Sequence, residues 1–269
     1  MDPETTRRLL AINRRFYAAR AAEFARTRGA AWPGWRRLLP ALRGLARDAA
    51  RGGRALRVLD AGCGNARFAR FLAAELAAAG PDAGAAVDYL GVDASAELLR
   101  AARGAGAGLR GFALLRADFA RAPDALAGLR GRFDAALLFG VLHHVPGAPL
   151  RRALLARLCA ALRAGGLLAL SAWQLHGDPR FAGRRLSWEA YNRGAAEPID
   201  LAQLEPGDAL LAFGSAQELP RYCHFGDESG IRALFEGLPL APGEGFRADG
   251  RSGELNRYYL LRRLPMQEP

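Results

Sequence analysis

Between residues 56 and 173 the sequence alternates short apolar runs with stretches of helical periodicity, and this alternation restricts the fold more than any other feature. The apolar runs, each bounded by Gly, Asp or polar turn residues, predict strands at about 56–60, 89–93, 112–116, 133–139 and 167–173. Helical periodicity fills the segments between them. A rhythm of this kind predicts an α/β fold: a doubly wound, mostly parallel, Rossmann-like sheet with helices on both faces.

Residues 1–54 precede the alternation and carry most of the net charge. Helical periodicity at about 4–28 and 36–50 predicts a basic helical N-terminal extension. The extension has 13 Arg and four acidic residues, a net charge of +9, whereas the other 215 residues carry only +2. All 38 basic residues are Arg, a bias that a GC-rich genome produces without any functional cause. The basic helix is therefore either a solvated face over a core or a surface for a polyanion.

Residues 55–269 are expected to form the main domain, with one interruption. The strand and helix rhythm stops after Trp173, and residues 174–226 read as an irregular insert. Long inserts of this kind often serve as substrate lids. The rhythm then resumes with a helix at 227–238 and a last strand at 256–262.

The sequence also points to a compartment. Three well-separated cysteines, Cys63, Cys159 and Cys223, form no CxxC pair and no disulfide framework. With the four His they show no zinc-ligand spacing, so no metal is expected. No apolar run is long enough to span a membrane, and the first residues lack the order of a signal peptide. A cytoplasmic protein without membrane contact is expected.

Three consecutive predicted strands end in an acidic residue: Asp60, Asp93 and Asp118. In open α/β sheets, ligands bind beyond the carboxyl ends of the strands, so these carboxylates are expected around one site. A glycine turn at 62–64 would let a ligand lie against backbone and a helix N-terminus. A dinucleotide is the obvious competitor, but Asp60 would repel its pyrophosphate, and Arg67 stands where its third glycine would be. A cationic nucleoside that carries an amino acid fits this rim better.

The three strand-end motifs are Asp60-Ala61-Gly62-Cys63-Gly64-Asn65, Val92-Asp93-Ala94-Ser95 and Ala117-Asp118-Phe119. They resemble the first three motifs of the class I S-adenosylmethionine-dependent methyltransferases. The resemblance implies a methyltransferase with S-adenosyl-L-methionine as cofactor. The loop would hold its methionine part, the second strand end its ribose hydroxyls and the third its adenine, with the end of the fourth strand nearby. The implied cofactor residues are Asp60, Gly62, Cys63, Gly64, Asp93, Ala94, Asp118, Phe119 and Phe139.

A narrower resemblance extends over most of the chain. Its motifs are Phe16-Tyr17, Phe24-Ala25-Arg26-Thr27-Arg28, Trp32-Pro33, Leu142-His143-His144-Val145, Arg151-Arg152, Leu162-Arg163-Ala164-Gly165-Gly166, Trp173-Gln174 and Arg221-Tyr222-Cys223-His224. In this order they resemble the tRNA wobble-uridine carboxymethyl methyltransferases. The resemblance implies esterification of the carboxylate of 5-carboxymethyluridine in the tRNA anticodon loop, and a small activating partner subunit. Two features depart from that pattern: Ala66 stands where Gly is usual, and the insert matches poorly.

A carboxylate is already a nucleophilic anion at neutral pH, so its methylation needs no general base. It needs in-line placement of the oxygen about 3 Å from the sulfonium methyl, and Arg suits that placement because its planar fork grips carboxylates. Tyr222 and Trp32 are candidates for stacking an unpaired base. The acceptor-side and catalytic candidates are His143, Arg26, Arg28, Arg221, Tyr222 and His224.

Other functions fit parts of the same sequence. The first is O-methylation of a small carboxylic acid or a phenol, in which a His could act as the base. The second is a non-catalytic protein that binds the cofactor or RNA. A dehydrogenase is the least favoured.

Overall fold

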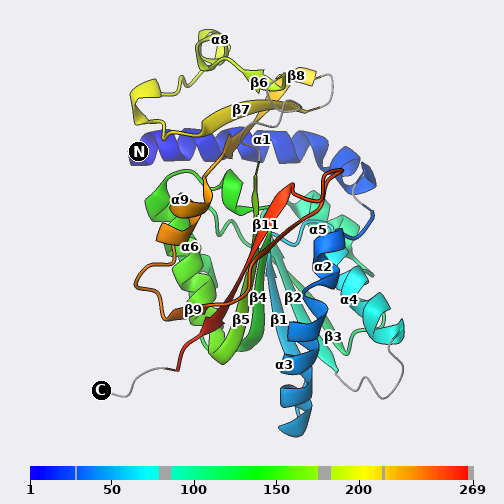
Figure 1. The fold of residues 1–269 in the computed structure, drawn as a ribbon. Coiled ribbons are helices and arrows are strands. Elements are labelled where there is room, and N and C mark those ends of the chain that lie inside the picture. The colour runs from blue at the N-terminus through cyan, green and yellow to red at the C-terminus, as the bar shows by residue number, and fades with distance from the viewer. Residues whose placement is uncertain (28, 79–85, 175–182, 214–215, 266–269) are drawn as a thin grey trace.

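The structure is a computed structural model that describes residues 1–27, 29–78, 86–174, 183–213 and 216–265. A central sheet runs through the protein (Figure 1). Within these residues its strand order is β10-β11-β5-β4-β1-β2-β3, and β9 pairs with the outer side of β11. The five strands expected from the sequence are parallel: β1 (Leu56–Ala61), β2 (Val87–Asp93), β3 (Gly111–Arg116), β4 (Phe133–Phe139) and β5 (Leu162–Trp173). The antiparallel strands are β9 (Leu240–Pro242), β10 (Phe246–Ala248) and β11 (Asn256–Arg263). The predicted α/β fold with a mostly parallel sheet is confirmed.

The order of the strands creates a crevice at one edge of the sheet. Strand β1 pairs with β2 on one side and with β4 on the other, so the chain winds outward in both directions from this point. Every residue of β4 is buried, as expected for a strand covered by helices on both faces. A topological switch between β1 and β4 is where α/β sheets bind their ligands.

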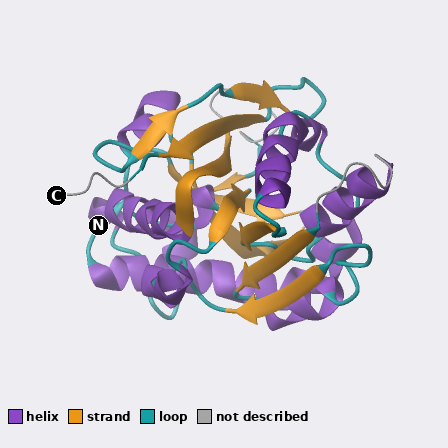
Figure 2. Cartoon of the chain, turned by 90° about the horizontal axis from the view of Figure 1, so that it is seen from below, coloured by secondary structure: helices purple, strands orange, loops and turns teal. Residues whose placement is uncertain are grey.

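Helices cover both faces of this sheet (Figure 2). They are α4 (Arg67–Ala78), α5 (Ala96–Ala102), α6 (Ala148–Ala161), α9 (Glu228–Ala233) and the 3-10 turns η2 (Pro123–Leu129) and η3 (Leu142–His144). The Ser95 hydroxyl accepts a hydrogen bond from Leu98 N at 3.2 Å and caps α5. The helix expected at 227–238 ends earlier, at Ala233. Among the helices of the described residues, none is both long and apolar enough to cross a membrane.

The N-terminal extension is helical, as expected, and consists of α1 (Pro3–Thr27), α2 (Pro33–Arg36) and α3 (Leu39–Arg51). Helix α3 lays one apolar face, with Leu42 and Leu45, on the same core as α4 and β1. Helix α1 lies across the carboxyl edge of the sheet, between it and the insert (Figure 1). The first helix is therefore part of the ligand-binding edge.

The insert is more regular than the sequence predicts. It forms a second, antiparallel sheet of β6 (Arg185–Leu186), β7 (Asp208–Phe213) and β8 (Ala216–His224), with α8 (Trp188–Gly194) and the turn η4 (Leu201–Gln203). Leu210 and Tyr222 of this sheet pack on Leu9 and Ile12 of α1. The small sheet thus packs on the side of α1 that faces away from the central sheet. The expectation that residues 174–226 form an irregular segment was wrong. These strands are difficult to predict from hydrophobic periodicity, because Pro220 is unusual within a strand and the apolar run of β7 is short.

Candidate active site

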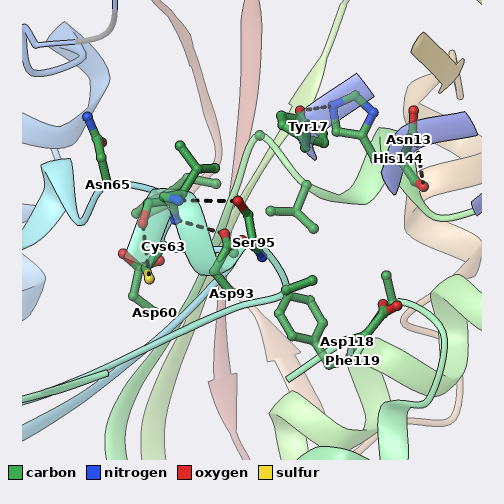
Figure 3. A pocket seen from close by; sticks show the side chains of 18 of the residues that line it. Asn13, Tyr17, Asp60, Cys63, Asn65, Asp93, Ser95, Asp118, Phe119 and His144 are labelled. Carbon is green, nitrogen blue, oxygen red and sulfur yellow. Dashed lines mark hydrogen bonds between the residues drawn. The ribbon is translucent and has the colours of Figure 1, made fainter. Parts of the chain in front are cut away.

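A pocket of about 630 Å³ opens at the carboxyl ends of β1, β2 and β4 and extends under α1 (Figure 3). Its volume lies within the range of small-molecule and cofactor sites, about 300–1,000 Å³. All nine residues that the sequence assigns to the cofactor line it: Asp60, Gly62, Cys63, Gly64, Asp93, Ala94, Asp118, Phe119 and Phe139.

The loop after β1 turns tightly against its neighbours. The backbone N–H groups of Gly62 and Cys63 donate to the carbonyl of Val92 at 2.7 and 3.1 Å. Gly62 has φ +79°, and a Cβ there would stand 2.2 Å from a methyl carbon of Val141. Only glycine fits at this position, and the resulting turn leaves backbone exposed on the pocket side.

Ala66, the departure from the family pattern, has a physical cost in this loop. Its φ is +52°, in the left-handed region that glycine adopts freely. A non-glycine residue there costs about 1–2 kcal/mol. Glycine, the usual residue at this position in the enzymes that the sequence resembles, would adopt this turn without that cost.

Asp93 joins two loops at the pocket floor. Its carboxylate accepts hydrogen bonds from Gly64 N at 2.9 Å and from Ser95 N at 2.8 Å. Burial raises the pKa of Asp93, while the backbone donors oppose that rise by stabilising the charged form. The residue therefore sets the relative position of the glycine loop and the start of α5.

Asp60 is buried beneath the loop, and the Tyr89 hydroxyl donates to its carboxyl. Burial, with a contribution from nearby Asp93, raises the pKa of Asp60 to about 7, although the bond from Tyr89 lowers it. Burial also raises the pKa of the Cys63 thiol far above its usual value. Cys63 therefore lines the pocket as a neutral thiol.

We expect Asp60 to make the stability depend on pH. Because its pKa rises from 3.8 to about 7 on folding, the native state keeps a proton that the unfolded state releases. The stability it contributes is therefore highest below about pH 4, falls up to about pH 7 and stays low above that, by about 4 kcal/mol at most. Thermal unfolding from pH 4 to 8 should show a smaller decline in Asp60→Asn than in the native protein. Equal declines in the two proteins would contradict this assignment.

Helix α1 supplies one wall of the pocket through a stripe of residues three and four positions apart: Leu10, Asn13, Arg14, Tyr17 and Ala18. Arg14 reaches across to Asp118, with 3.7 Å between the guanidinium and the carboxylate. Sequence reasoning missed the role of Asn13. The signal was present, because Asn13 and Tyr17 are spaced one helical turn apart on the same face.

The wall opposite the glycine loop comes from segments far apart in the chain. His144 of η3, Trp173 at the end of β5 and Arg221 of β8 all line the pocket. The Arg221 side chain is buried, and its guanidinium carbon lies 5.1 Å from the Trp173 ring centroid and 5.5 Å from that of Phe16. A cation is thus held against aromatic faces at the edge of the pocket.

The structure does not bring His143 to the pocket lining. Its ring stacks on Trp173 with 3.8 Å between centroids, so it supports the wall from behind. His144, the next residue, faces the cavity instead. The short 3-10 turn of η3 determines which of the two histidines points inward, and no local sequence pattern distinguishes them.

Tyr222 and His224 lie on the face of β8 opposite Arg221, because side chains alternate along a strand. The Tyr222 hydroxyl and His224 Nδ1 bond to one carboxylate oxygen of Asp208, at 2.7 and 2.8 Å. Glu205 lies beside them and holds Arg151 at 2.7 Å. The structure therefore places both residues in a network that fixes the insert on α6, outside the pocket lining.

The remaining predicted residues are basic. Arg26 is exposed and is not part of the pocket lining, and Arg28 lies outside the described residues. Several arginines of α1 form ion pairs with acidic residues: Arg7 and Arg8 with Glu4, Arg14 with Asp118, and Arg20 with Glu23.

Comparisons with known proteins agree with this geometry. Residues 59–168 match the methyltransferase domain family. No protein of curated function matches the chain in sequence. Among solved structures, an S-adenosylmethionine-dependent methyltransferase from Methanosarcina mazei is 18% identical, with a TM-score of 0.55 over 78% of this chain and 93% of that one. The N-methyltransferase NodS from Bradyrhizobium japonicum, in complex with S-adenosylhomocysteine, is 15% identical, with a TM-score of 0.54 over 97% of this chain and 98% of its own.

A third structure, an amino pentose methyltransferase from Micromonospora echinaspora with bound S-adenosylmethionine, is 18% identical, with a TM-score of 0.51 over 91% of this chain and 96% of its own. At these identities the likeness to solved structures is one of fold. The matched residues include the glycine turn at 62–64, Asp93, which joins two loops at the pocket floor, and Asp118, which lines the pocket. Residues 59–168 therefore match a methyltransferase domain, and the chain has the fold of S-adenosylmethionine-dependent methyltransferases.

Proposed function

We propose that S-adenosylmethionine lies along the strand ends, with its methionine part on the Gly62–Gly64 loop, its ribose at Asp93 and its adenine beside Asp118 and Phe119. All these groups line one pocket, which supports a single continuous ligand. Burial raises the pKa of both Asp60 and Asp93, and a ligand that carries a sulfonium and an ammonium group would stabilise their charged forms.

We further propose that the acceptor is the carboxylate of a modified wobble uridine, 5-carboxymethyluridine, in the anticodon loop of tRNA. One observation carries this proposal. Five residues from separate motifs that resemble the wobble-uridine enzymes line the same pocket, although they lie up to 204 positions apart: Tyr17, Trp32, His144, Trp173 and Arg221. Convergence of these motifs around the cofactor site is what a shared acceptor would require.

The chemistry follows from the charge of the acceptor. A carboxylate oxygen attacks the sulfonium methyl, a C–O bond forms as the S–C bond breaks, and neutral S-adenosylhomocysteine leaves. No proton moves, so the protein supplies placement and exclusion of water. Arg221, buried against Trp173, is the cation that would orient the carboxylate.

Nucleoside mass spectrometry of tRNA from cells with and without the gene tests this acceptor. A methyl ester at uridine should be present with the gene and replaced by the free acid without it. An unchanged nucleoside profile would contradict the tRNA assignment. The resemblance also adds a small activating partner subunit to the proposal, and turnover by the purified chain alone would argue against that partner.

A small carboxylic acid is the second candidate acceptor, and one observation favours it. Because Arg7, Arg8, Arg14 and Arg20 are paired with acids, much of the positive charge of α1 is already neutralised within the protein. Less of it is then available for the phosphates of a tRNA.

Salt dependence separates the two candidates. If tRNA binds the N-terminal helix, its affinity should fall linearly with salt on logarithmic axes, with a slope near the number of phosphates contacted. Neutralising Arg14, Arg15, Arg26 and Arg28 together should lower tRNA affinity about tenfold or more at physiological salt and make that slope shallower. The matched control is Arg43→Gln with Arg47→Gln on α3, away from the pocket lining. Affinity without salt dependence, or equal losses in both variants, would exclude the tRNA-binding role of α1.

A further inference from the structure

Two side chains that face the pocket form a pair whose acid–base chemistry is not required for methylation of a carboxylate. The Tyr17 hydroxyl of α1 lies 2.9 Å from Nε2 of His144 in η3, so the bond spans the cavity wall between two elements (Figure 3). Both residues line the pocket. A phenol bonded to an imidazole at such a place is a proton-transfer pair.

The surroundings of His144 fix its tautomer. Its Nδ1 lies 3.0 Å from the backbone carbonyl of Tyr222, and a carbonyl oxygen can only accept. Nδ1 therefore carries the hydrogen, and in the neutral ring Nε2 is the acceptor. The Tyr17 hydroxyl must then donate to Nε2, and a phenol oxygen that donates its hydrogen can also accept one.

Asn13 holds this pair in place from the neighbouring turn of α1. Its side-chain amide donates to the carbonyls of His144 and Tyr222 at 3.3 and 3.2 Å, and its carbonyl oxygen accepts from Tyr222 N at 2.9 Å. One buried side chain thus fixes the backbone on both sides of the imidazole. The geometry of the pair is set before a ligand binds, as proton transfer requires.

The charged and titratable groups around His144 come from three elements. Tyr17 faces it from α1, His143 from η3 with 4.1 Å between ring centroids, and Cys223 from β8 with Sγ 3.7 Å from Nδ1. Arg221 of β8 lines the same pocket. Burial raises the pKa of Cys223 to about 11, so the thiol stays neutral.

We propose that Tyr17 and His144 form a proton-accepting relay, and that the site can therefore also methylate an acceptor whose oxygen must lose a proton, such as a phenol. The acceptor O–H gives its proton to the Tyr17 oxygen, and the Tyr17 proton passes to His144 Nε2. The freed oxygen forms a C–O bond with the methyl group as the S–C bond breaks. The products are a methyl ether, neutral S-adenosylhomocysteine and a protonated His144, which then releases its proton to solvent.

The probe 4-hydroxyphenylacetate tests this activity, because one molecule offers both a phenol and a carboxylate. Product analysis by NMR and mass spectrometry separates the methyl ether from the methyl ester. General base catalysis contributes about 100-fold or more, so Tyr17→Phe should lower the ether-to-ester ratio by about that factor.

Tyr191→Phe is the matched control, because Tyr191 lies on α8 and bonds Arg15 outside the main pocket. It should leave the ratio unchanged. The absence of ether from the native protein, or an unchanged ratio in Tyr17→Phe, would overturn the relay. Formation of the ether without any ester would support the relay and count against the proposed carboxylate acceptor. The experiment therefore distinguishes failure of the relay from failure of the proposed function.

Discussion

Replacing Asp93 with alanine is expected to abolish turnover and to lower the affinity for S-adenosylmethionine by about 100-fold or more. The carboxylate accepts backbone hydrogen bonds from both Gly64 and Ser95. Hydrogen bonds to a charged group contribute about 1.5–3 kcal/mol each, and two of them together exceed the energy of a 100-fold change. Without the bridge the glycine loop and the start of α5 separate, and the proposed ribose contact is lost. Isothermal calorimetry with S-adenosylmethionine measures the effect directly.

Asp124→Ala is the matched control for Asp93. Asp124 lies in η2, is largely exposed and pairs with Arg157 at the surface. Its loss should leave cofactor affinity within about twofold, since exposed ion pairs contribute little. Thermal unfolding of both variants separates a local loss of binding from a failure to fold. Cofactor affinity that survives in a folded Asp93→Ala protein would remove this residue from the cofactor site.

The second large effect is expected at Arg221. Arg221→Met keeps an apolar side chain of similar length against Trp173 but removes the buried cation. If the guanidinium orients a carboxylate through charge-assisted bonds, kcat/KM for a carboxylate acceptor should fall about 100-fold. Cofactor affinity should change far less, because the contact is on the acceptor side. Steady-state kinetics at saturating S-adenosylmethionine, together with calorimetry, measures both quantities.

Arg185→Met provides the comparison for Arg221. Arg185 belongs to the same small sheet and also lies over an aromatic ring, that of Phe225 at 5.5 Å, but it does not line the pocket. Its replacement should leave kcat/KM within about twofold, as surface changes usually do. Equal losses in both variants would mean that the small sheet, and not the Arg221 cation, supports activity.

The cofactor half of the site could be predicted from the sequence because it is local. Asp60, the glycine turn and Asp93 each stand at the end of an apolar run, and parallel strands bring their carboxyl ends to one edge. A residue that follows a predicted parallel strand in the sequence is therefore expected at the ligand-binding edge of the sheet. All nine cofactor residues that the resemblance implies line the pocket.

The acceptor half follows from contacts that no local pattern shows. Arg221 faces the pocket and Tyr222 does not, because β8 is a strand whose alternation was hidden in an apparently irregular insert. The choice between His143 and His144 depends on one 3-10 turn. Helical spacing puts Asn13 and Tyr17 on one face of α1, but that face reaches the site only because the small sheet packs α1 against the edge of the central sheet. These placements are set by packing between distant segments.

The most direct test of the account uses the purified protein, S-adenosylmethionine with a deuterated methyl group, and tRNA from cells that lack the gene. We expect the label to appear in a uridine methyl ester, detected by nucleoside mass spectrometry and removed by mild alkaline hydrolysis, and the Arg221→Met protein to form far less of it. A protein that binds S-adenosylmethionine but transfers no label to tRNA, under conditions where it methylates a small carboxylic acid, would contradict the proposed acceptor.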